Sequence, residues 1–77
     1  MTQYIKRIFN PLEVYFFQDG VFGENIYVIV VEDAKSIGKK VVDFYNLVGD
    51  EIPLVILTKE EWENFDKALK QKGEKIL

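Results

Sequence analysis

The chain has 77 residues, of which 48% are hydrophobic and 30% are charged, and its formal net charge is -3. This length predicts one small domain over residues 1–77, and the apolar fraction excludes a disordered chain. The sequence contains no cysteine and no histidine. Disulfides, thiol nucleophiles and Cys/His zinc sites are therefore excluded, and the commonest general base is missing, so most enzyme mechanisms are excluded as well.

The first eleven residues, MTQYIKRIFNP, carry Lys6 and Arg7 but neither a continuous apolar run nor a small-residue cleavage site. They do not resemble a signal peptide, and no apolar run of transmembrane length follows them. We therefore expect a cytoplasmic protein without a membrane partner. The charge comes mostly from Lys and Glu, and there is a single serine, a bias that is typical of thermophile proteins.

The first predicted element is short and amphipathic. Its apolar residues are Tyr4, Ile5, Ile8 and Phe9. Their spacing fits a helix and fits a strand nearly as well, and Pro11 ends either one.

Two strands with a glycine-containing loop between them come next. The first runs from about Leu12 to Gln18, and the second is the β-branched run Ile26–Val31, which is apolar on both faces. Turn signals at residues 19–20 and 23–25 separate them, so we expect an antiparallel hairpin whose second strand is central in a sheet.

The period of the apolar residues changes after the second strand. One helical face carries Ala34, Ile37, Val41, Phe44 and Val48. Asp33 is placed to cap the N-terminus of this helix, and Gly49 is placed to end it.

A third, buried strand is predicted over Ile52–Leu57, followed by a capping box in which Thr58 is the N-cap and Glu61 is the third helical residue. The apolar face of the last helix carries Trp62, Phe65 and Leu69. Gly73 ends that helix, and the final EKIL is expected as a short edge strand. The order (α)ββαβα(β) predicts an α/β (α+β) fold, with a small mixed sheet of three to four strands and two to three helices.

The stretches VYFFQDGVFGENIYVIVV and IPLVILTKEEWENF, in this order, resemble the minimal nucleotidyltransferase domain of the DNA polymerase β-like superfamily. Members typically read LFGSRARG, SDIDLLVV, an I-P-V-D strand, a helix that opens T-x-E-E, and a final G-x-x-L. The resemblance covers about Glu13 to Leu77. It implies a loop that binds a nucleotide triphosphate, and three strand carboxylates that bind divalent metal.

The positions that carry this chemistry in the family hold other residues here. They are Gln18 and Asp19 for the Gly-Ser pair, Gly20 and Phe22 for the loop arginines, Asn25 and Tyr27 for the strand-two carboxylates, and Val55 for the third carboxylate. The resemblance therefore implies a degenerate, catalytically inactive domain with no cofactor and no metal.

Two other sets of residues are candidate sites, and each also has a simpler structural explanation. Glu32 and Asp33, with Glu24 or Asp19, offer oxygen ligands for Mg²⁺ or Ca²⁺, although a helix cap explains them more simply. Ser36 is a candidate nucleophile without an identifiable base, and a residue of the first helical turn is the simpler reading.

Nucleic-acid binding is a second class of function. Lys39, Lys40 and the segment KALKQKGEK are basic, and three tyrosines (Tyr4, Tyr15 and Tyr27) offer rings for stacking on bases. The negative net charge of the whole chain argues against it, because such affinity depends mainly on phosphate contacts.

A protein-interaction module is the third class, and it accounts for more of the sequence. The first strand carries large apolar groups on both faces, so Tyr15 and Phe17, together with Phe22 in the loop, are expected to form a partner surface if helices leave that face uncovered. We therefore predict a homodimer, or a complex with a helical partner as in toxin–antitoxin pairs. A nucleotide- or nucleic-acid-binding sensor without transfer activity is the alternative.

Overall fold

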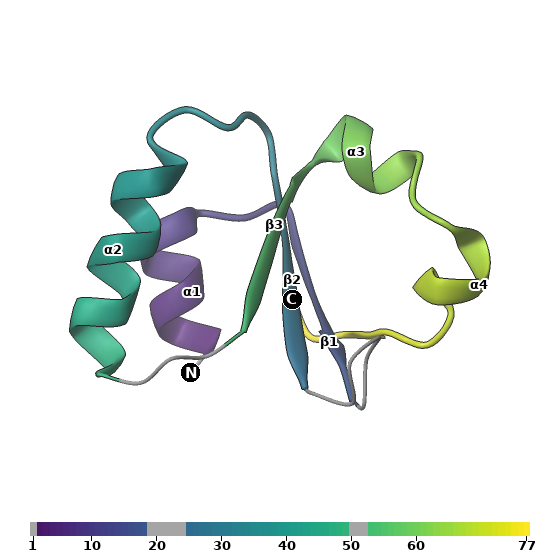
Figure 1. Cartoon of the computed structure of the whole chain (residues 1–77), viewed down its shortest axis with the longest axis horizontal. Helices are drawn as coiled ribbons and strands as arrows, with labels where there is room; N and C mark the ends of the chain where they lie inside the picture. Colours follow the sequence, from purple (N-terminus) through teal and green to yellow (C-terminus); the bar gives the residue numbers. More distant parts are fainter. Residues whose placement is uncertain (1, 19–24, 50–52) are drawn as a thin grey trace.

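The computed structural model describes residues 2–18, 25–49 and 53–77. A sheet forms the middle of the molecule, with helices on both of its faces (Figure 1). One face carries α1 (Thr2–Phe9) and α2 (Ile37–Val48), and the other carries α3 (Lys59–Glu63) and α4 (Lys67–Lys70). This arrangement confirms the mixed α and β fold class that the sequence predicts.

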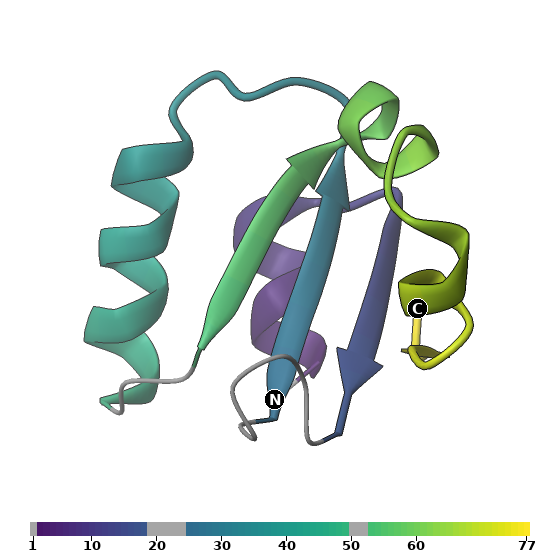
Figure 2. The ribbon, with the colours of Figure 1, turned by 45° about the vertical axis from the view of Figure 1, so that its right-hand side comes forward.

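Within the part of the chain that the structure describes, the sheet has four strands in the order β3-β2-β1-β4. They are β1 (Glu13–Phe17), β2 (Ile26–Val31), β3 (Leu54–Thr58) and β4 (Glu74–Lys75). The pair β1/β2 is antiparallel and the pair β2/β3 is parallel, which confirms the predicted hairpin and the predicted mixed sheet. The short β4 pairs antiparallel with β1, so β3 and β4 are the two edges (Figure 2).

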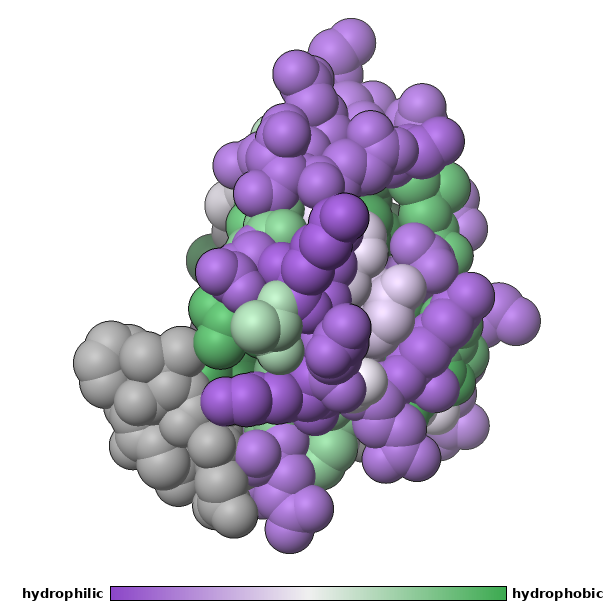
Figure 3. Space-filling view, turned by 90° about the vertical axis from the view of Figure 1, so that its right-hand side faces the viewer, coloured by the Kyte–Doolittle hydropathy of each residue, from purple (hydrophilic) through white to green (hydrophobic). Residues whose placement is uncertain are grey.

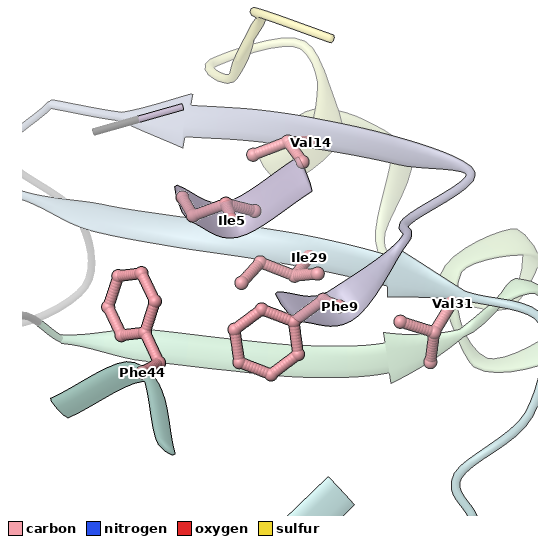
Figure 4. Packing of buried hydrophobic residues seen from close by; sticks show 6 residues of the cluster. All are labelled: Ile5, Phe9, Val14, Ile29, Val31 and Phe44. Carbon is pink, nitrogen blue, oxygen red and sulfur yellow. The ribbon is translucent and has the colours of Figure 1, made fainter. Parts of the chain in front are cut away.

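The main hydrophobic core lies between the sheet and the pair α1/α2. Its buried members are Ile5, Phe9, Val14, Ile29, Val31 and Phe44 (Figure 4). The rings of Phe9 and Phe44 join the two helices, with their centroids 5.8 Å apart. The first segment is therefore a helix, which settles the choice between helix and strand that its spacing leaves open.

The predicted start of α2 is wrong. The helix begins at Ile37, after Ser36 in the left-handed region with φ of 59°, and no side-chain hydrogen bond caps it. The Asp33 carboxylate instead accepts a hydrogen bond from the Lys35 backbone N–H at 2.9 Å. Short polar side chains favour such local turns over helix, which delays the helix by one turn. Gly49, with φ of 75°, ends the helix as predicted.

The last predicted helix is two short helices, so the described residues form four helices rather than two to three. The capping box at its start is confirmed: the Glu61 N–H donates to Thr58 Oγ1 at 3.2 Å, and the Thr58 N–H donates to Glu61 Oε1 at 2.9 Å. Asp66 then accepts from the N–H groups of Ala68 and Leu69 and starts a second helix. A strong N-cap inside the apolar pattern therefore divides the segment.

Candidate functional site

The positions named by the resemblance lie on and around the β1/β2 hairpin. Gln18 directly follows β1, and the exposed Asn25 directly precedes β2. Asp19 and Phe22 fall outside the residues that the structure describes. Gly20, the other predicted loop position, falls outside them too. The predictions made for the phosphate-binding loop therefore remain predictions.

Tyr27 lies on the face of the sheet that α1 and α2 cover. Its ring packs against Phe16 of β1, with the centroids 5.1 Å apart, and the residue is half buried against the main core. An aromatic ring in this position contributes packing. It offers no carboxylate oxygen, which is what a magnesium site requires.

Val55 lies on the opposite face of the sheet from Tyr27. In the parallel pair β2/β3 it lies beside Val28, whereas Tyr27 lies beside Leu54. Neighbouring residues of a strand point to opposite faces. The structure therefore does not bring together the three positions that the resemblance assigns to metal ligands.

The acidic residues after β2 lie at the other end of that strand from Asn25. Glu32 and Asp33 are exposed, and Asp33 holds the turn described above. Their proposed companions Glu24 and Asp19 fall outside the described residues. Over residues 2–18, 25–49 and 53–77, no group of three His, Cys, Asp or Glu residues comes together as a set of metal ligands. The candidate nucleophile Ser36 is exposed, with no neighbouring base in the described hydrogen bonds.

The aromatic residues predicted as an interface pack inside the chain. Tyr15 stacks on Trp62 with centroids 4.5 Å apart, and Phe17 meets the same indole edge-on at 6.5 Å. Phe65 stacks on Trp62 at 5.4 Å, and the Lys70 ammonium lies 4.9 Å from the indole centroid. Trp62 is 7% exposed. The second face of β1 is therefore covered by α3, and an interface role for Tyr15 and Phe17 stays a prediction that this packing does not favour.

A small polar cluster of side chains links β1 to β4 beside this aromatic stack. The Tyr15 hydroxyl donates to Glu13 Oε2 at 2.8 Å, and Lys75 Nζ lies 3.1 Å from the same oxygen. The Tyr15 hydrogen bond, supported by Lys75, lowers the pKa of Glu13. Burial, and then the hydrogen bond to Glu13, raises the pKa of Tyr15. The cluster holds β4 against β1. The spacing of Glu13 and Tyr15, two residues apart on one strand, is the sequence signal for it.

The outer surface of α3 and α4 is largely hydrophilic, with small hydrophobic areas between the polar side chains (Figure 3). Large hydrophobic side chains are exposed elsewhere in the described chain. They are Leu12, Val42, Leu47, Val55 and Leu77. The sequence predicts none of these five as part of a partner surface, because their exposure depends on how the helices pack.

No protein-family model, curated protein or solved structure matches this chain. The resemblance to nucleotidyltransferases therefore rests on the quoted residues alone. None of the described helices is long and apolar enough to span a membrane.

Proposed function

We propose that this chain is a non-catalytic, cytoplasmic protein-interaction domain with a degenerate nucleotidyltransferase-like sequence, and that it acts as a homodimer. Two features of the domain support it: the residues that stand at the chemical positions of the family it resembles, and the exposed apolar surface.

The placement of Tyr27 and Val55 carries the first argument. Tyr27 packs on Phe16 at 5.1 Å and belongs to the apolar side of α1 and α2, and Val55 lies on the other face of the sheet. A triphosphate requires metal ions to offset its charge, and the metal ions require carboxylates that converge on one face. Tyr27 and Val55 supply no carboxylate, and their side chains do not converge on one face.

Exposed apolar side chains carry the second argument. Val42 is 57% exposed and Leu47 is 50% exposed on α2, and Val55 is 38% exposed on β3. In a domain of about 70–80 residues the core supplies only about 3–5 kcal/mol of net stability, so covering apolar surface by association has a large relative effect. Two-fold dimers are the commonest way in which soluble chains achieve this.

Calorimetric titration with Mg-ATP and the other Mg-nucleoside triphosphates tests the first argument. We expect no heat of binding at micromolar nucleotide. Micromolar binding without transfer would favour the alternative of a nucleotide sensor, and metal-dependent transfer would show that the chain is an enzyme.

Light scattering over a dilution series tests the second argument. We expect the mass of a dimer above micromolar concentration and a fall toward the mass of a monomer on dilution. A monomer at every concentration would contradict the homodimer and would leave only a complex with a different protein.

A further inference from the structure

We propose that the outer edge of β3 is the surface through which two copies of this chain associate, as an antiparallel, two-fold pair of β3 strands centred on Val55. This inference rests on the proposed interaction function and names the surface. It joins two four-stranded sheets into one continuous sheet.

Among the described residues, the β3 edge carries none of the features that normally prevent strand pairing. Edge strands are usually protected by charged side chains, proline or a covering segment. The strand reads LVILT and has no charge. It ends the sheet order on the side away from β4, and no described segment crosses in front of it (Figure 1). Pro53 gives no protection, because its carbonyl accepts from the Tyr27 N–H and its nitrogen therefore points inward, toward β2.

The backbone groups of this edge select one register. Since Pro53 points toward β2, alternation along the strand directs the N–H and C=O groups of Leu54 and Ile56 outward. The Thr58 N–H, the next in this series, already donates to Glu61 Oε1 at 2.9 Å. In an antiparallel pair, Leu54 of each copy can lie opposite Ile56 of the other copy. The outward N–H and C=O groups of both residues are then all hydrogen-bonded, and Thr58 is not needed. Moving the two-fold axis by one residue, from Val55 to Ile56, would pair Leu54 with Thr58 and leave the Leu54 carbonyl without its donor.

A second copy is the occupant that this register fits. Two-fold symmetry places identical residues against each other at the axis, which requires uncharged side chains there. In the register above, Val55 faces Val55 of the second copy as a non-hydrogen-bonded pair, with Cα atoms about 4.5 Å apart. Val55 is 38% exposed in the single chain. Its exposed surface would therefore be covered by the pairing.

The adjoining side of α2 is compatible with this pairing. Phe44 points toward α1, and Val42, two residues earlier, lies on nearly the opposite side of the helix. Figure 2 shows α2 on the β3 side of the sheet and α1 behind β2. Val42 is 57% exposed, and nothing lies within 4 Å of the place where a Cβ of Gly38 would be. This flank therefore carries two small, uncharged residues, Gly38 and Val42, with Lys39, Tyr45 and Asn46 next to Val42 on the helix surface.

Disulfide crosslinking tests the register. The chain has no cysteine, so Val55→Cys introduces a single thiol. The Cα separation of a non-hydrogen-bonded pair is within the range that a disulfide spans. Under mild oxidation we expect most of this variant to become a covalent dimer. Leu47→Cys is the matched control, because Leu47 is also exposed but lies on the other flank of α2, and it should stay uncrosslinked. Equal crosslinking of the two variants would overturn the proposal.

A charge at the axis tests the surface without any crosslink. Val55→Lys places two ammonium groups against each other, and we expect its dimer dissociation constant to rise at least tenfold in light scattering, while Leu47→Lys leaves it unchanged. Circular dichroism verifies that both variants are folded. A wild-type dimer that Val55→Lys does not weaken would overturn this inference and leave the proposed homodimer intact, using another surface. A wild-type monomer at every concentration would overturn both.

Discussion

The two faces of the sheet are covered in different ways. Between the sheet and α1/α2, Ile5, Ile29 and Phe44 are completely buried, and helices of 8 and 12 residues lie over them. On the other face the helices have only 5 and 4 residues, and Trp62 is the buried side chain that they contribute to the cluster there. The first face is a conventional helix-on-sheet core, whereas the second is an aromatic stack with an exposed Val55 beside it.

This difference indicates which face contributes most to the stability of the fold and which face leaves apolar surface exposed for association. Burial on the α1/α2 face comes from many residues on long elements, so its effect is distributed. The α3/α4 face depends on a few rings in fixed positions, and it does not extend over the whole of β3. The open strand edge therefore adjoins the face with the thinner cover.

Truncating Phe44 should have the largest effect. Phe44→Ala removes a fully buried ring that contacts Phe9, at an expected loss of about 3–5 kcal/mol. A domain of this size has about that much net stability, so we expect the variant to be largely unfolded by circular dichroism at 25 °C. Leu47→Ala, on the exposed flank of the same helix, should change the free energy of unfolding by less than about 0.5 kcal/mol. A folded Phe44→Ala protein would show that the α1/α2 face is not the main core.

Adding one methyl group at Gly73 should have the next largest effect, on the other face. A Cβ at this position would lie 2.5 Å from Cζ of Phe17, and Phe17 packs edge-on against Trp62. We expect Gly73→Ala to lower the free energy of unfolding by about 1–3 kcal/mol through overpacking, measured by urea denaturation. Gly38→Ala is the control, because a Cβ there meets nothing within 4 Å, and it should not destabilise the dilute monomer. An unchanged midpoint for Gly73→Ala would mean that the aromatic stack moves freely.

The capping box should have a smaller effect, limited to the start of α3. Thr58→Ala leaves the Glu61 N–H without its 3.2 Å acceptor and should cost about 1 kcal/mol. Ser36→Ala makes a matched comparison at the start of α2, where the side chain makes no capping hydrogen bond. That change should cost less than about 0.5 kcal/mol in the same thermal denaturation. Equal losses of stability in the two variants would show that the Thr58 side chain caps α3 no better than the Ser36 side chain caps α2.

The smallest expected effect concerns the polar cluster and its pH dependence. The pKa of Glu13 is lowered in the folded chain, so the ionised carboxylate contributes stability above its unfolded pKa and loses that contribution as pH falls through the folded pKa. Glu13→Gln should therefore be less stable than the wild type at about pH 7, and the difference should disappear toward about pH 2. A difference that stays constant with pH would assign the effect to packing rather than to charge.

The sequence predicts local elements of this fold better than their packing. Hydrophobic periodicity identifies α2, and the order Thr58 to Glu61 identifies the start of α3. The break between α3 and α4 was missed because Trp62 and Phe65 keep a helical spacing across it, while Asp66 competes as an N-cap. An N-cap acts through local hydrogen bonds and does not change the spacing of the apolar residues, so the periodicity does not reveal the break.

The candidate site was harder to predict, for a geometric reason. A shift of one residue in strand register moves a side chain to the other face of a sheet. An alignment by motif order therefore did not reveal that Tyr27 and Val55 lie on opposite faces. Likewise, the cover that Trp62 gives to Tyr15 depends on a contact distant in sequence, which no local pattern reports.

Amide hydrogen exchange by NMR at two protein concentrations tests the central claim, that copies associate through the β3 edge. At a concentration where light scattering gives a dimer, the outward N–H groups of Leu54 and Ile56 should exchange at least tenfold more slowly than in the dilute monomer. Val28 lies in the central strand β2, which is paired with β1 and β3 in the single chain. Its N–H serves as the internal reference. Exchange at Leu54 and Ile56 that does not depend on concentration, relative to Val28, would contradict the account.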